Sequence, residues 1–133
     1  MDRTRFLLRT SAIYALIGAF IGSHMAGAGG YEFRAVHAHI LVVGWLSLFA
    51  FAMYYRVFRI PKDSKLATFH VYTAFFGSLG LTAGMWLYYV KPIEGMDTFN
   101  LIFFIGGGSI LMICFVLFAI MAFVHGKYIQ EQG

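Results

Sequence analysis

Four long apolar segments, separated by short polar stretches, dominate the pattern of this 133-residue chain. They cover about residues 6–24, 33–55, 66–90 and 99–124. About 20 consecutive apolar residues are enough for a helix to cross the hydrocarbon core of a bilayer. The pattern therefore predicts an all-α integral membrane protein, in which four transmembrane helices form one antiparallel arc or bundle and a single domain spans residues 1–133.

Composition and charge support this interpretation. Hydrophobic residues make up 60% of the chain and charged residues only 12%, which is too apolar for a typical soluble domain. The basic residues behind the net charge of +4 lie in the polar stretches or near the ends of the apolar segments, so the charge indicates membrane orientation rather than nucleic-acid binding. Eight of the ten basic residues fall on one side of the predicted membrane: Arg3, Arg5, Arg9, Arg56, Arg59, Lys62, Lys65 and Lys127. We therefore expect both termini to be cytoplasmic, in a protein of the bacterial inner membrane.

Two glycine patterns predict close contacts between helices. Gly18 and Gly22 are four residues apart in the first apolar segment, and Gly80 and Gly84 repeat this spacing in the third, with Gly77 one turn earlier. Small residues at this spacing let membrane helices approach closely. The single cysteine, Cys114, lies inside an apolar segment and is expected to pack as a small hydrophobic residue.

The second apolar segment carries the candidate chemistry. His37 and His39 lie near its start, and ionisable residues inside a membrane segment need a partner. Residues two apart on a helix point about 200° apart, so the two imidazoles should face different neighbours. No acidic residue lies within the apolar segments, which argues against a carboxylate-based proton pump, and no paired nucleophile and base suggests a hydrolase.

The surroundings of the two histidines are compatible with haem. Haem iron accepts axial imidazoles, and Gly44, two turns after His37, could leave room for a flat macrocycle. Arg34 lies near the predicted outer surface, where a guanidinium can pair with carboxylates such as haem propionates. Interhelical hydrogen bonding by the histidines and interfacial anchoring by Arg34 are the alternatives.

The other histidines divide between the two predicted membrane surfaces. His24 falls on the same side as His37 and His39, and the three could form a copper or zinc site. His70 is expected to cap or hydrogen-bond at the inner interface, and His125 is expected to be solvated. His37 and His70 begin antiparallel neighbouring helices, so one chain cannot combine them in a single site.

A family resemblance extends over the residues around these histidines. The stretch from Phe33 to Trp45, with Phe49 and the following Tyr54-Tyr55-Arg56, resembles the second-helix region of heme–copper oxidase and nitric oxide reductase catalytic subunits. It is more similar to small four-helix proteins labelled oxidase subunit I-like. The resemblance implies that His37 and His39 are axial ligands of haem b, with Arg34 and Gly44 in the binding site. It does not extend to the further copper-ligand histidines or to a proton channel, so it leaves enzymatic activity open.

The same resemblance implies an assembly. The large family members form three arcs of four helices, so a homotrimer of this chain would imitate that plan, with a dimer as the alternative. Haem sites between protomers would then carry electrons or bind a small gas such as O₂ or NO, with an unidentified redox partner. Two other functions remain open: a copper- or zinc-binding membrane protein, and a non-catalytic oxidase assembly subunit.

Overall fold

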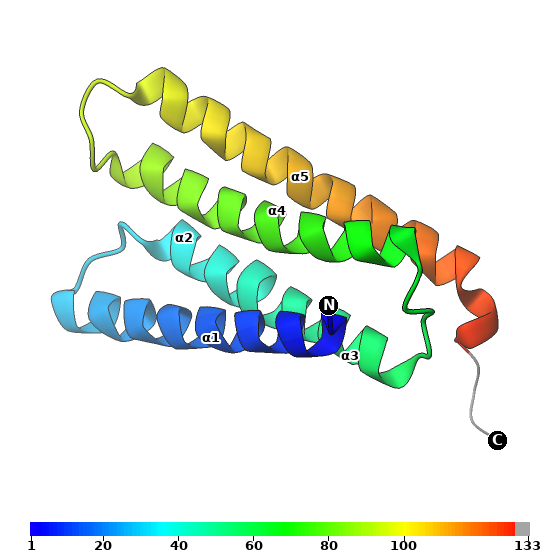
Figure 1. The fold of residues 1–133 in the computed structure, drawn as a ribbon. Helices are drawn as coiled ribbons and strands as arrows, with labels where there is room; N and C mark the ends of the chain where they lie inside the picture. Colours follow the sequence, from blue (N-terminus) through cyan, green and yellow to red (C-terminus); the bar gives the residue numbers. More distant parts are fainter. Residues whose placement is uncertain (130–133) are drawn as a thin grey trace.

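The computed structural model describes residues 1–129, and all regular secondary structure within them is helical. Helix α1 spans Arg3–Ala28, α4 spans Lys65–Val90 and α5 spans Asp97–Val124. Between α1 and α4, one continuous rod consists of α2 (Arg34–His39), the π-helix η1 (Ile40–Ser47) and α3 (Leu48–Val57). A short 3₁₀ turn, η2 (Gly126–Tyr128), follows α5. Figure 1 shows that consecutive rods run antiparallel, with α4 between α5 and the first two rods.

The helices extend slightly beyond the apolar segments because their ends are capped by polar residues and glycine. The Asp2 side chain accepts a hydrogen bond from the Arg5 amide at 2.9 Å, and Ser64 accepts one from the Ala67 amide at 3.2 Å. Such caps satisfy amides that have no partner within the helix. Gly29 ends α1 in the left-handed region, with φ of 67°, which glycine adopts without steric cost.

The π-helix is a feature that the apolar pattern did not predict. It spans Ile40–Ser47 and begins directly after His39. The Ser47 hydroxyl donates to the carbonyl of Val42, five residues earlier, at 2.9 Å. A π-helix widens the turn relative to an α-helix, so residues after Ile40 do not keep the register that a regular helix would give them relative to His37.

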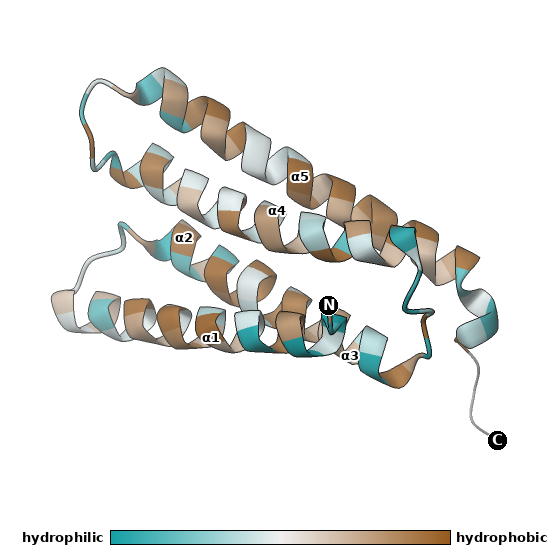
Figure 2. Ribbon diagram, viewed as in Figure 1, coloured by the Kyte–Doolittle hydropathy of each residue, from teal (hydrophilic) through white to brown (hydrophobic). Residues whose placement is uncertain are grey.

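Three rods within residues 1–129 are long and apolar enough to cross a membrane: Arg3–Ala28, Arg34–Val57 and Asp97–Val124. Figure 2 shows that apolar residues dominate these rods and that polar residues cluster near the loops. Helix α4 is 26 residues long, but it buries more polar side chains than any of these three rods. They are His70, Thr73, Ser78 and Thr82. The hydroxyls of Thr73 and Thr82 donate to carbonyls one turn earlier on the same helix, at 3.0 and 2.9 Å.

Glycines bring the rods together in pairs, as their spacing predicted. In the α4–α5 pair, a Cβ on Gly77 would lie 2.6 Å from the Leu111 amide nitrogen, and one on Gly80 would lie 2.9 Å from the Gly107 Cα. In the pair formed by α1 and the rod of α2, η1 and α3, the side chain of Leu41 packs against Gly18, and the imidazole of His37 packs against Gly22. The structure is therefore two helical hairpins, each packed closely at glycine.

Polar contacts join the two hairpins at the end of the molecule that carries the N-terminus, the 58–64 loop and His125, which we call the basic end. Arg3 is largely buried there, and its guanidinium donates to the carbonyls of Pro61, Lys62 and Ser64 at 2.9–3.0 Å. It also donates to the Thr68 hydroxyl at 3.0 Å. Arg3 therefore fastens the start of α1 to the loop and first turn that lead into α4.

The glycine contacts predict a sharp difference between two neighbouring positions of α5. A Cβ on Gly107 would collide with the backbone of Gly80, whereas one on Gly106 would meet nothing within 4 Å. We expect Gly107→Ala to destabilise the protein by about 1–3 kcal/mol through overpacking. Thermal unfolding in mild detergent measures this, with Gly106→Ala as the matched control. Equal midpoints for the two variants would contradict the close approach of α4 and α5.

Candidate functional site

His39 lies on the outward-facing side of α2, near the end of that helix. Its Nδ1 is 2.9 Å from the carbonyl oxygen of Ala35, one turn earlier. A carbonyl oxygen can only accept a hydrogen bond, so Nδ1 donates its proton and the lone pair of the neutral ring lies on Nε2. The ring is partly exposed, and its neighbours Ala35 and Ala38 are exposed and small. The imidazole of His39 is therefore held in one orientation, on a helix surface formed by small side chains.

His37 points in a different direction, toward α1 of the same chain. A Cβ on Gly22 would lie 2.8 Å from Cε1 of His37, so the ring occupies the space that this glycine provides. The Nδ1 atom of His37 is buried without a hydrogen-bond partner among residues 1–129. The predicted divergence of the two imidazoles is present, but His37 has an intrachain neighbour, whereas His39 faces outward.

The expectation that Gly44 leaves a flat surface for a macrocycle is not met within the chain. The ring of Tyr14 from α1 fills the space beside Gly44, and a Cβ there would collide with it. Tyr14 is buried, and its hydroxyl reaches the Ser78 hydroxyl of α4 at 3.5 Å. Gly44 therefore serves helix packing, in the same way as Gly18 and Gly22.

Arg34 and His24 are both exposed near the end opposite the basic end. The guanidinium carbon of Arg34 lies 5.6 Å from the centroid of the Tyr31 ring, and Arg34 belongs to neither of the ion pairs found among the described residues. Its charge is therefore available to an anionic group. Residues 1–129 contain no group of three or more His, Cys, Asp or Glu side chains arranged to hold a metal ion, so His24, His37 and His39 do not form such a site within one chain.

The structure reveals a polar cluster that sequence reasoning missed, at the basic end. His70 forms a hydrogen bond, as expected, with its Nδ1 2.8 Å from the Tyr55 hydroxyl, and its side chain is fully buried. That hydroxyl also donates to the carbonyl of Ala67 at 3.1 Å and approaches the Met121 sulfur at 3.7 Å. The ring of Phe51 packs edge-on against His70 at 4.6 Å. One signal in the sequence was available: Ala67 and His70 share a helix face, and a tyrosine ends the preceding apolar segment.

His125 is also buried, contrary to the expectation that it is solvated. It is 7% exposed because η2 folds back after α5 and brings the Tyr128 ring within 6.0 Å of the imidazole. Its Nε2 lies 3.5 Å from the Ser64 hydroxyl at the start of α4. Burial lowers the pKa of His125, and the positive charges of Arg3 and Lys127 act in the same direction.

No protein-family model, curated protein or solved structure matches this chain.

The lowered pKa of His125 predicts a loss of stability in mild acid. The ordinary value is 6.5, so as the pH falls below it the unfolded chain takes up a proton that the folded chain accepts only at lower pH. The contribution of His125 is therefore constant at neutral pH and becomes destabilising below about pH 6.5. Thermal midpoints in detergent between pH 7.5 and 5.5 should fall less steeply in His125→Gln than in the wild type. The exposed His24→Gln is the control, and a wild-type slope in His125→Gln would refute the prediction.

Proposed function

We propose that this chain is an integral membrane protein that crosses the bilayer four times, with both termini in the cytoplasm of a bacterial cell. Three rods have the required length and apolar character. Helix α4 is the fourth, because it lies between α5 and the first two rods, and its threonine hydroxyls bond to its own backbone. The concentration of Lys and Arg at the basic end supports a cytoplasmic location for that end.

The proposed orientation can be tested with single cysteines placed in exposed loop positions. Asp63 lies in the loop at the basic end and Glu94 in the loop at the opposite end, and both are exposed. A membrane-impermeant thiol reagent applied to intact cells should label Glu94→Cys and leave Asp63→Cys unlabelled. Both should react after permeabilisation. Labelling of Asp63→Cys alone in intact cells would mean that the orientation is inverted.

We further propose that the protein binds haem b between copies of the chain, with His39 as an axial ligand. The observation that carries this proposal is the hydrogen bond from Nδ1 of His39 to the Ala35 carbonyl. Ligating histidines characteristically donate their other ring nitrogen in this way, which fixes the tautomer and the ring orientation. An imidazole left partly exposed on a membrane helix also requires a partner.

The residues around His39 fit a flat, partly anionic group. Ala35 and Ala38 keep the surface beside the imidazole low, in the role that the sequence had suggested for Gly44. Arg34 is exposed, lies closer to the end of the rod and has no ion-pair partner among residues 1–129. It would pair with propionates there. When bound, such a group supplies electron transfer if two imidazoles ligate it, or a position for O₂ or NO if only one does.

The second imidazole distinguishes two assemblies. A closed trimer would pair His39 of one copy with His37 of the next, which requires His37 to turn away from Gly22. A two-fold pair would bring His39 against His39 of the other copy and requires no such rearrangement, because a two-fold interface repeats the same surface on both subunits. The intrachain packing of His37 favours the two-fold pair over the trimer that the resemblance implied.

The absorption spectrum of the protein purified in mild detergent tests the haem proposal. We expect a Soret band in the wild type and its loss in His39→Ala, whereas His24→Ala should retain it. The two-fold arrangement holds one haem per two chains in the wild type, and His37→Ala should retain the Soret band. The trimer holds one haem per chain, and His37→Ala should lose the band. Bound copper or zinc without a Soret band would favour the metal-binding alternative. The absence of both a Soret band and bound metal would favour an assembly subunit.

A steric variant separates ligation from general damage to the helix. Ala35→Leu keeps His39 and the backbone carbonyl that orients it, but raises the surface on which the macrocycle would lie. Leucine is a good helix former, so the variant should fold normally and lose the Soret band. Ala50→Leu, at an exposed position further along the same rod, is the matched control. A normal Soret band in Ala35→Leu would exclude this surface as the site.

A further inference from the structure

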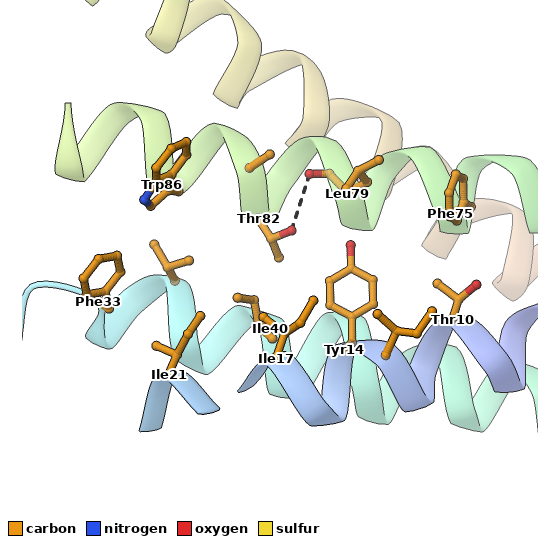
Figure 3. A pocket seen from close by; sticks show the side chains of 13 residues that line it. Thr10, Tyr14, Ile17, Ile21, Phe33, Ile40, Phe75, Leu79, Thr82 and Trp86 are labelled. Carbon is orange, nitrogen blue, oxygen red and sulfur yellow. Dashed lines mark hydrogen bonds between the residues drawn. The ribbon is translucent and has the colours of Figure 1, made fainter. Parts of the chain in front are cut away.

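A cavity of about 400 Å³ separates the two hairpins. Figure 3 shows that its walls come from α1, from α2 and the start of η1, and from α4, with Tyr14 and Ile17 opposite Leu79 and Thr82. Trp86 and Phe33 lie at one end of the cavity, and Thr10 and Phe75 lie at the other. Glycine contacts close each hairpin internally, whereas no described glycine lies at the contact between α1 and α4.

The chemistry of the walls selects an apolar occupant. The lining consists of aliphatic and aromatic side chains with a few hydroxyls, and it includes no charged residue or histidine. The Thr82 hydroxyl donates to the Ser78 carbonyl at 2.9 Å, and the Thr10 hydroxyl donates to the Phe6 carbonyl at 2.9 Å. These hydroxyls are therefore already satisfied. A cavity of this size and character matches the range for small-molecule sites and is too apolar to hold water well.

The length of the cavity corresponds to one leaflet of a bilayer. Its lining runs from Thr10 to Ile21 on α1 and from Phe75 to Trp86 on α4. At 1.5 Å per residue each wall is about 16 Å long. The hydrocarbon core of a bilayer is about 30 Å thick, so the cavity is about as long as half of that core. An acyl chain lying parallel to the helices fits this length.

One side of the cavity is open to the surroundings of the protein. Ile17 and Leu79 line it, yet they are 44% and 48% exposed, so a chain can enter sideways between α1 and α4. Trp86 is 40% exposed at the end of the cavity, and its indole N–H has no hydrogen-bond partner within the described residues. Tryptophan at a membrane interface combines an apolar ring with a polar donor.

We propose that this cavity binds one acyl chain of a membrane phospholipid, with the ester carbonyl at the Trp86 indole and the chain end near Thr10. The proposal rests on the membrane insertion proposed above and is independent of haem. The bound chain fills the space between α1 and α4, two helices that meet through no glycine contact among the described residues.

Photolabelling tests the proposal. The protein is reconstituted into phosphatidylethanolamine and phosphatidylglycerol vesicles that contain a phospholipid with a diazirine midway along one acyl chain. After irradiation, mass spectrometry of peptides should locate the label on α1 and α4 at the cavity walls. Ala83→Phe fills the cavity from α4 and should reduce this labelling by about tenfold, since it removes space for several methylene groups. Ile17→Trp fills the cavity from α1 and should reduce the labelling to a similar extent.

Ala119→Phe is the matched control, because Ala119 is exposed on α5 and does not line the cavity. It should leave the labelling unchanged. Equal labelling of the cavity walls in the wild type and in both filled variants would overturn the proposal and indicate surface contact with lipid only. Cross-links between two protein chains at these walls would also overturn it and indicate a second copy as the occupant. Flotation of the vesicles with each variant verifies insertion separately, so failure of the lipid site is distinguishable from failure of membrane insertion.

Discussion

Close approach at glycine determines which helices in this protein touch and which do not. Apolar helices gain little by leaving a lipid environment for one another, so association depends on packing at small residues and on polar contacts. Gly77, Gly80 and Gly107 draw α4 against α5, and Gly18 and Gly22 draw α1 against the second rod. The two hairpins lack such contacts with each other, which leaves the cavity between them.

Polar contacts replace glycine packing where the hairpins do meet. Arg3 donates to the carbonyls of the 58–64 loop and to Thr68, and the Tyr55 hydroxyl bonds to His70 and Ala67 of α4. Both groups lie at the basic end, and the hydroxyls of Tyr14 and Ser78 form a further contact between the hairpins, at 3.5 Å. A buried charge such as that of Arg3 persists only when it is hydrogen-bonded in this way.

The apolar pattern predicted the helical class and the approximate helix limits, because length and hydropathy are local properties. The glycine spacings predicted close contacts, which the structure has at Gly22 and Gly80. The pattern did not predict the π-helix after His39. It also suggested Gly44 as a surface for a macrocycle, but the ring of Tyr14 occupies that space. His70 hydrogen-bonds near the basic end, as expected, but its complete burial depends on packing partners that hydropathy does not record. The burial of His125, which was expected to be solvated, depends in the same way on Tyr128. The divergence of His37 and His39 follows from helix geometry alone, but which of them faces outward depends on Gly22.

The second rod brings these features together around a single helix turn. His37 lies against α1, Val36 and Ile40 line the cavity, and His39 is oriented outward by Ala35. Consecutive residues on an α-helix differ by 100°, so the imidazole of His39 and the cavity wall at Ile40 are about a quarter turn apart. The proposed site at His39 and the cavity therefore lie on different faces of one rod, and a variant that fills the cavity from α1 or α4 leaves the face of His39 unchanged.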